Sequence, residues 1–175
     1  PAETMLDALK AAGRDVIAIG KIRDIFAGRG ITEAVYTSGN TEGIARTLAC
    51  MDRDFDGLCF TNLVDFDMLY GHRNNCEGYG RALEEFDRAL PGMMAKLGDG
   101  DVLMITADHG CDPGYTVSTD HSREYVPLLV YGKRIKAVNL GTKPTYACIA
   151  KTVCDMLGIE NSLAGESFRD EISTR

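Results

Sequence analysis

The sequence of 175 residues lacks a long apolar run, a secretory signal and an excess of positive charge. A membrane-spanning helix needs about 20 apolar residues, and residues 1–4 have neither the basic region nor the apolar core of a secretory signal. The net charge is −7, which argues against the nucleic-acid backbone as a main ligand. We therefore expect a globular, cytoplasmic protein with no membrane or nucleic-acid partner.

Closely spaced cysteine pairs are also absent. The six cysteines form no Cys-x-x-Cys motif, and several lie in apolar segments, which favours free buried thiols over disulfides or a thiolate zinc site. Cys111 lies two residues after His109 and is an alternative, soft metal ligand. The neighbouring carboxylates suit a harder metal.

Histidine is scarce, and its placement is the most informative feature of the chain. Each of the three histidines follows an aspartate by one to five residues. The pairs are Asp67 with His72, Asp108 with His109, and Asp120 with His121. Imidazole nitrogens and carboxylate oxygens together make sites for zinc or manganese. The pattern predicts a metal site, against the alternative that the pairs are ordinary turns, helix caps or surface features.

Short apolar runs alternate with amphipathic segments along the chain, which predicts an α/β fold. We expect strands at residues 15–19, 34–37, 58–64, 102–106 and 127–131. We expect helices at residues 3–13, at 41–51 with Thr41 as N-cap, from about 77, and at 144–157. Pro91 is expected to kink or divide the third helix, and the apolar spacing of the last two helices turns Leu83 and Tyr146 inward. The order implies one domain with a mainly parallel sheet and helices on both faces.

The acidic and histidine residues follow the predicted strands at one edge of this sheet. Open α/β sheets form their sites outside the carboxyl ends of the strands. The five candidate ligands are Asp67, His72, Asp108, His109 and His121. Five ligands exceed the needs of a three-ligand zinc centre and suit two metals that share an oxyanion. Lys21 follows the end of the first strand, and its side chain either contacts a phosphate or is solvated. Asp65 is expected to be a turn residue or a residue that supports the ligands.

Four segments resemble the bacterial phosphopentomutase family of the alkaline phosphatase superfamily. They are residues 19–22, 62–73, 105–113 and 118–132, and the similarity covers essentially the whole chain. The resemblance implies an alkaline-phosphatase-like core that interconverts ribose 1-phosphate and ribose 5-phosphate, or their deoxyribose equivalents. It also implies two Mn²⁺ ions, a phosphorylated threonine that bridges them, and a bisphosphate intermediate.

The resemblance also divides the candidate ligands between the two ions. It implies that Asp67, His72 and His121 bind one Mn²⁺ and that Asp108 and His109 bind the other. Lys21 matches a lysine that the family places near its substrate.

The sequence departs from the family in what it lacks. The family's metal-binding aspartate near the N-terminus, its threonine nucleophile and its inserted cap domain have no counterpart in the chain, which also has no starting methionine. We therefore expect residues 1–175 to be the C-terminal part of the core domain, and to be inactive as a mutase alone. The alternatives are a cofactor-independent phosphoglycerate mutase, a metal-dependent phosphatase, or a non-catalytic metal-binding domain. The oligomeric state stays open, and pairing with another chain is one way to cover an exposed sheet edge.

Overall fold

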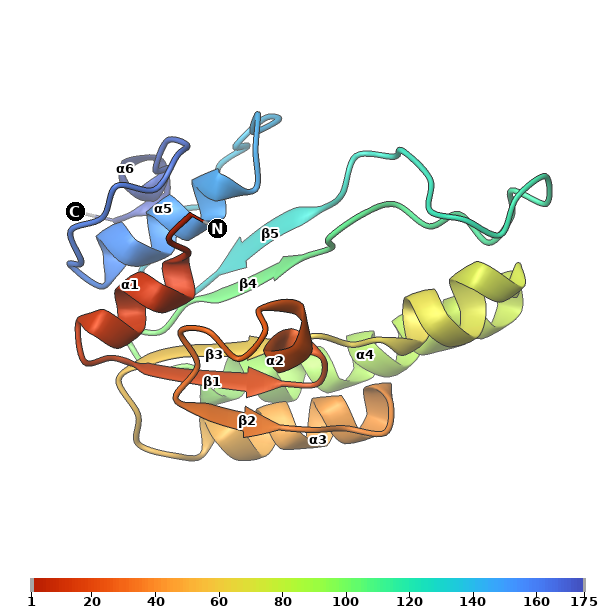
Figure 1. Cartoon of the computed structure of the whole chain (residues 1–175), viewed down its shortest axis with the longest axis horizontal. Helices are drawn as coiled ribbons and strands as arrows, with labels where there is room; N and C mark the ends of the chain where they lie inside the picture. The colour runs from red at the N-terminus through yellow and green to blue at the C-terminus, as the bar shows by residue number, and fades with distance from the viewer. Residues whose placement is uncertain (1, 175) are drawn as a thin grey trace.

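A three-stranded parallel sheet forms the centre of the fold (Figure 1), in a computed structural model that describes residues 2–174. Strand β1 (Asp15–Ile19) lies between β2 (Glu33–Val35) and β3 (Gly57–Thr61), and both neighbours run parallel to it. The carboxyl ends of the three strands therefore meet at one edge, as the sequence predicts.

Helices cover both faces of this sheet. The helices of the described residues are α1 (Met5–Ala11), α2 (Ile22–Ile25), α3 (Asn40–Met51), α4 (Cys76–Lys96), α5 (Ala147–Met156) and α6 (Arg169–Ile172), of which α6 packs on the second core described below. Successive side chains of a strand point to opposite faces. Val16 and Ala18 of β1 accordingly pack with α1 and α5, whereas Ile17 and Ile19 pack against Cys50 of α3. The predicted α/β class, with helices on both faces, is confirmed.

The last two strands form a separate antiparallel pair. Strand β4 (Leu103–Thr106) pairs with β5 (Leu128–Tyr131), and their inner face packs on a second core around Phe168 and Ile172. The single mainly parallel sheet predicted from the sequence is thus parallel over β1–β3 only. Parallel strands need a crossover, usually helical. The connection over residues 107–127 is an extended loop that returns the chain beside β4 (Figure 1), so β5 runs antiparallel.

Three local predictions about the helices are wrong in whole or in part. Thr41 is not the N-cap of α3, which begins at Asn40 after Gly39. Pro91 does not divide α4, which continues as one helix to Lys96. Leu83 is half exposed, because the buried positions of α4 are Gly78, Ala82 and Met93.

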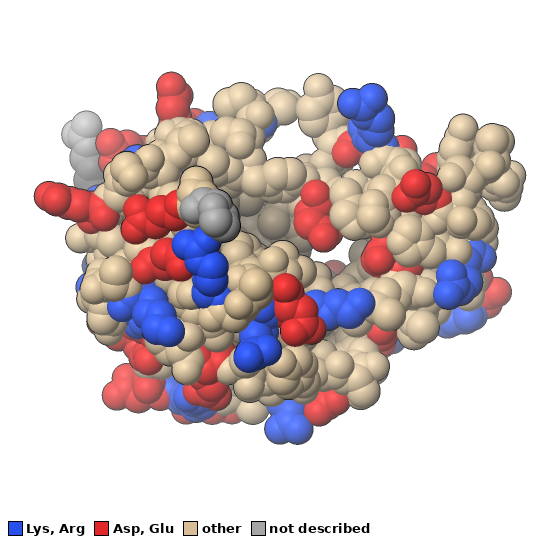
Figure 2. Space-filling view, viewed as in Figure 1, with Lys and Arg blue, Asp and Glu red and all other residues tan. Residues whose placement is uncertain are grey.

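The surface charge and the helix composition concern the nucleic-acid and membrane partners considered above. Acidic and basic side chains are interspersed over the face drawn in Figure 2, which shows no continuous basic surface among the described residues. Within residues 2–174, no helix combines the length and the apolar content that a bilayer span requires.

Candidate metal centre

A tight turn beyond the carboxyl end of β3 carries the first two candidate ligands. After β3 the chain forms a π-helical turn, η1 (Phe66–Tyr70), and a single 3-10 turn, η2 (Gly71–Arg73), so Asp67 and His72 lie on consecutive turns. The start of η1 is fixed by the first turn of α3. The Asn40 amide N–H donates to the Asp65 carboxylate at 2.7 Å, and the Asp65 N–H donates to the Asn40 side-chain oxygen at 2.9 Å. Asp65 is therefore a turn residue that caps α3, as expected, and holds the chain two residues before Asp67.

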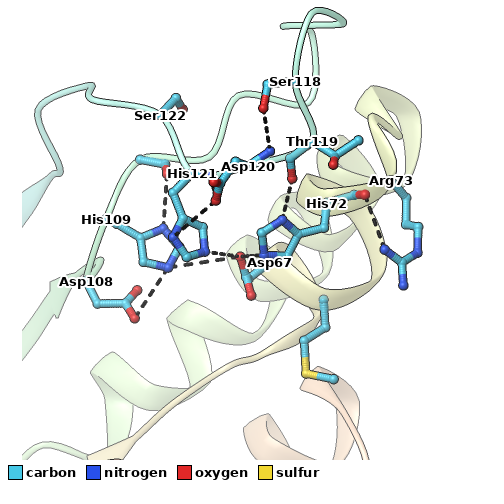
Figure 3. Close-up of polar contacts among 12 residues, drawn as sticks. Asp67, His72, Arg73, Asp108, His109, Ser118, Thr119, Asp120, His121 and Ser122 are labelled. Atoms are coloured by element: carbon cyan, nitrogen blue, oxygen red, sulfur yellow. Dashed lines mark hydrogen bonds and ion pairs between the residues drawn. The ribbon is translucent and has the colours of Figure 1, made fainter.

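Three imidazoles converge on one oxygen atom of Asp67 (Figure 3). Asp67 Oδ1 lies 3.1 Å from His72 Nε2, 3.3 Å from His121 Nε2 and 4.0 Å from His109 Nε2. The same oxygen is buried and has no hydrogen-bond partner among the described residues. A buried acceptor without a partner costs about 1–3 kcal/mol, and more when it is charged. Such an atom indicates that something else is to be bound there.

The other ring nitrogens show what that partner would be. Nδ1 of His72 lies against the Thr119 carbonyl oxygen, and Nδ1 of His109 lies 3.0 Å from the Gly110 carbonyl oxygen. A carbonyl can only accept, so each Nδ1 is the donor and carries the proton. In the neutral ring Nε2 is then a bare lone pair aimed toward the Asp67 carboxylate. Lone pairs and a carboxylate repel one another unless a cation lies between them.

The residues therefore fit a divalent metal ion. Donation of the second ring nitrogen to a carbonyl is how metal-bound histidines are usually oriented. Two ligands that each lie about 2.1 Å from one ion are separated by about 3 Å, which matches the 3.1 and 3.3 Å spacings to Asp67 Oδ1. Ligand atoms of Asp67, His72 and His121 all lie within 4.8 Å of one another.

Asp108 and His109 adjoin this group without completing a second one. The His109 ring stacks on that of His121 with centroids 3.7 Å apart, and Asp108 Oδ2 lies 3.7 Å from His109 Nε2. Within residues 2–174 no third carboxylate, imidazole or thiolate joins these two residues. The structure thus brings all five predicted ligands to one place, three of them as a compact set.

Lys21 lies at the predicted edge but does not touch the ligands. It follows β1, its side chain is exposed, and Nζ lies 2.7 Å from the sulfur of Met68, the residue after Asp67. The contact of Lys21 with phosphate stays a prediction.

Cys111 supports the centre by packing. Its sulfur fills the space beside Gly71, where any Cβ would overlap it. Burial raises the pKa of the Cys111 thiol, and the nearby Asp67 carboxylate raises it further. The thiol is outside the three-ligand group, so the structure does not favour it as the alternative soft ligand.

Two supporting residues were missed from the sequence. The Thr119 carbonyl orients His72, and the Tyr146 hydroxyl donates to the Asp108 carbonyl at 2.8 Å. Tyr146 was expected to face the core but is half exposed. The Thr119 carbonyl could not be predicted, because every residue type has a main-chain acceptor. Tyr146 was assigned to the core because its helical spacing is the same whether or not its hydroxyl has a hydrogen-bond partner.

A model of the metalloenzyme superfamily matches residues 6–161, which include all five candidate ligands. The chain belongs to the metalloenzyme superfamily. Membership agrees with the α/β fold and with metal dependence, both expected from the sequence.

Individual relatives are also similar over nearly the whole chain. It is 60% identical over 171 residues to a phosphopentomutase of Acetivibrio thermocellus, and 57% identical over 171 residues to one of Carboxydothermus hydrogenoformans. It is 55% identical over 172 residues to a phosphopentomutase of Lachnoclostridium phytofermentans. These matches cover 97–98% of this chain and 44% of each relative. The chain therefore spans less than half the length of the curated relatives it matches.

Proposed function

We propose that this metalloenzyme chain supplies metal ligands to a phosphopentomutase, which interconverts ribose 1-phosphate and ribose 5-phosphate or the deoxyribose equivalents. Metal binding rests on one observation: the buried Asp67 oxygen that has no hydrogen-bond partner within residues 2–174 and that faces Nε2 of His72 and His121. The choice of reaction rests on the relatives of 55–60% identity that carry this name.

In this proposal the five residues hold two Mn²⁺ ions. Asp67, His72 and His121 hold one ion, and Asp108 and His109 contribute to the other. Paired divalent ions stabilise charge on both the attacking and the leaving oxygen of a phosphoryl transfer. The chain's own residues fix the ligand directions through the carbonyls of Thr119 and Gly110. Lys21 adds a positive charge on the same edge for the phosphate of a pentose phosphate.

We also propose that further core residues complete the centre. Asp108 and His109 offer only two ligands to the second ion. Among the described residues, β3 pairs only with β1 and β4 only with β5, so each has one unpaired edge, and the surface is hollowed near the segment that follows β4 (Figure 2). An additional segment with a strand, a further aspartate and the threonine nucleophile would supply what the family's reaction needs. Residues 1–175 would then be the C-terminal part of the core domain, with the cap domain outside them.

Product analysis tests the reaction. A protein extended to the length of the relatives should convert ribose 1-phosphate to ribose 5-phosphate with Mn²⁺ and without net release of phosphate. Release of inorganic phosphate would instead support a metal-dependent phosphatase, and interconversion of phosphoglycerates would support the other superfamily mutase. The chain of 175 residues alone should show no isomerisation even with excess Mn²⁺, because it lacks the nucleophile.

Calorimetry tests the metal site separately from the reaction. Substituting His72 by alanine should strongly weaken binding at the three-ligand site, and substituting His109 should weaken only the second. Unchanged Mn²⁺ binding in both variants would leave a non-catalytic domain with incidental histidines as the better description.

A further inference from the structure

The side-chain amide of Asn74 gathers three main-chain carbonyls of one loop. Its Nδ2 lies 3.0 Å from the oxygen of Tyr115, 3.3 Å from that of Ser118 and 3.4 Å from that of Pro113. An amide group has two hydrogens, so the three acceptors share them. Asn74 is half buried, whereas most of the loop over residues 112–121 is exposed.

This loop carries the third ligand and the group that orients the second. Thr119 provides the carbonyl that accepts a hydrogen bond from His72 Nδ1, and His121 provides an Nε2 for the three-ligand group. The base of the loop is closed by the Ser122 N–H, which donates to the Gly110 carbonyl at 3.0 Å. Within the described residues, the hydrogen bonds that tie residues 113–118 to residues outside the loop over 112–121 all come from Asn74. The loop is otherwise held by local turns, and its Val117 side chain is 83% exposed.

The backbone of Asn74 makes its amide replaceable without disturbing the turn. Its φ of 49° and ψ of 37° lie in the left-handed region, directly after the η2 turn that holds His72. Asparagine tolerates this conformation and glycine adopts it freely. Substitution by glycine therefore removes the three hydrogen bonds and keeps the backbone path.

We propose that Asn74 is a positioning residue. It holds the loop over residues 112–121, which carries His121, against the η2 turn, which carries His72, and so assembles the three-ligand group. Asn74 contacts no ligand atom itself and acts through the loop. The inference rests on the proposed metal site, and it goes beyond it in naming what holds the two ligand segments together.

The test is Mn²⁺ binding to the chain, measured by calorimetry and by the paramagnetic resonance signal of free Mn²⁺. Loss of a supporting residue in a metal site costs about 10–100-fold in affinity, and the Asn74→Gly variant should fall in this range. The Asn74→Asp variant should lose at least as much, because a carboxylate faces the three carbonyls with no hydrogen to donate. Each variant is first shown to be folded by its thermal unfolding in EDTA.

A matched control separates positioning from general stability. Thr4 caps α1, at the opposite end of the molecule from the loop (Figure 1), and its side chain accepts from the Asp7 N–H. The Thr4→Ala variant loses a comparable hydrogen bond and should keep the parent affinity for Mn²⁺.

A double-mutant cycle with His121→Ala provides a readout that a structural role would not move. If Asn74 acts by placing His121 and its loop, Asn74→Gly should weaken Mn²⁺ binding far less in the His121→Ala background than in the parent. Equal losses in both backgrounds, or parent affinity in both Asn74 variants, would overturn the role of Asn74. Absence of Mn²⁺ binding by the parent chain would overturn the proposed metal site itself.

Discussion

Replacing Asp67 with asparagine should separate metal binding from stability, because the two depend on the carboxylate in opposite ways. In the metal-free protein, Asp67 Oδ1 is a buried charged acceptor without a hydrogen-bond partner among the described residues. An asparagine amide in the same place can donate to His72 Nε2, 3.1 Å from the present oxygen. The free energy of unfolding should then rise by about 1 kcal/mol or more, which is about 2–4 °C in Tm for a domain of this size.

Metal binding should change in the opposite direction. At a Mn²⁺ concentration 100 times the Kd, binding to the native state adds about 2.7 kcal/mol to the parent. A direct ligand contributes more than a supporting residue, whose loss costs about 10–100-fold, so Asp67→Asn should lose more than about 100-fold in affinity. The same Mn²⁺ concentration should then stabilise the variant by less than about 0.4 kcal/mol.

The assay is thermal unfolding at pH 8, where histidine is ordinarily neutral, in EDTA and in Mn²⁺. Asp99→Asn is the matched control, because it removes an exposed carboxylate whose partner is Lys133, at 3.2 Å. This control should follow the parent in both conditions. An Asp67→Asn protein that is less stable than the parent in EDTA, yet still gains stability from Mn²⁺, would refute the reasoning.

Three further predictions concern stability, one beside the site and two in α1. Gly71→Ala should destabilise the protein by about 1–3 kcal/mol, because the new methyl group overlaps the Cys111 sulfur. Adding Cys111→Ala to this variant should recover part of the lost free energy of unfolding, measured with denaturant. Free-energy losses of the two substitutions that simply add would contradict the contact. Leu9→Ala should cost about 2–5 kcal/mol in the same assay, because Leu9 is fully buried. Hydrogen bonds from Thr4 lower the pKa of Asp7, so its stabilisation is present above the ordinary carboxyl pKa and is lost as pH falls through the lowered value. Asp7→Asn should therefore flatten the acid limb of the stability profile, and an unchanged limb would count against this linkage.

The sequence predicted the strands well where burial alone determines them. Residues 15–19 form β1 within the predicted bounds, because four consecutive apolar residues are buried between two helical layers. The convergence of Asp67 and Asp108 was also predicted, from the carboxyl ends of the strands that precede them, although these strands, β3 and β4, lie in separate sheets.

What the sequence could not predict depends on partners distant along the chain. The carboxylate that caps α3 is that of Asp65, 25 residues beyond Asn40, so a prediction from the local sequence chose Thr41 instead. The direction of β5 depends on the path of a loop without helical periodicity. Orientation of His72 by the Thr119 carbonyl involves main-chain atoms, which any residue type supplies.

The most direct test of a metal held by Asp67, His72 and His121 is anomalous X-ray scattering from crystals grown with Mn²⁺ and measured at the manganese absorption edge. The account predicts an anomalous peak within bonding distance of Asp67 Oδ1 and of Nε2 in His72 and His121. A peak elsewhere, or none while those atoms keep their present spacing, would contradict it.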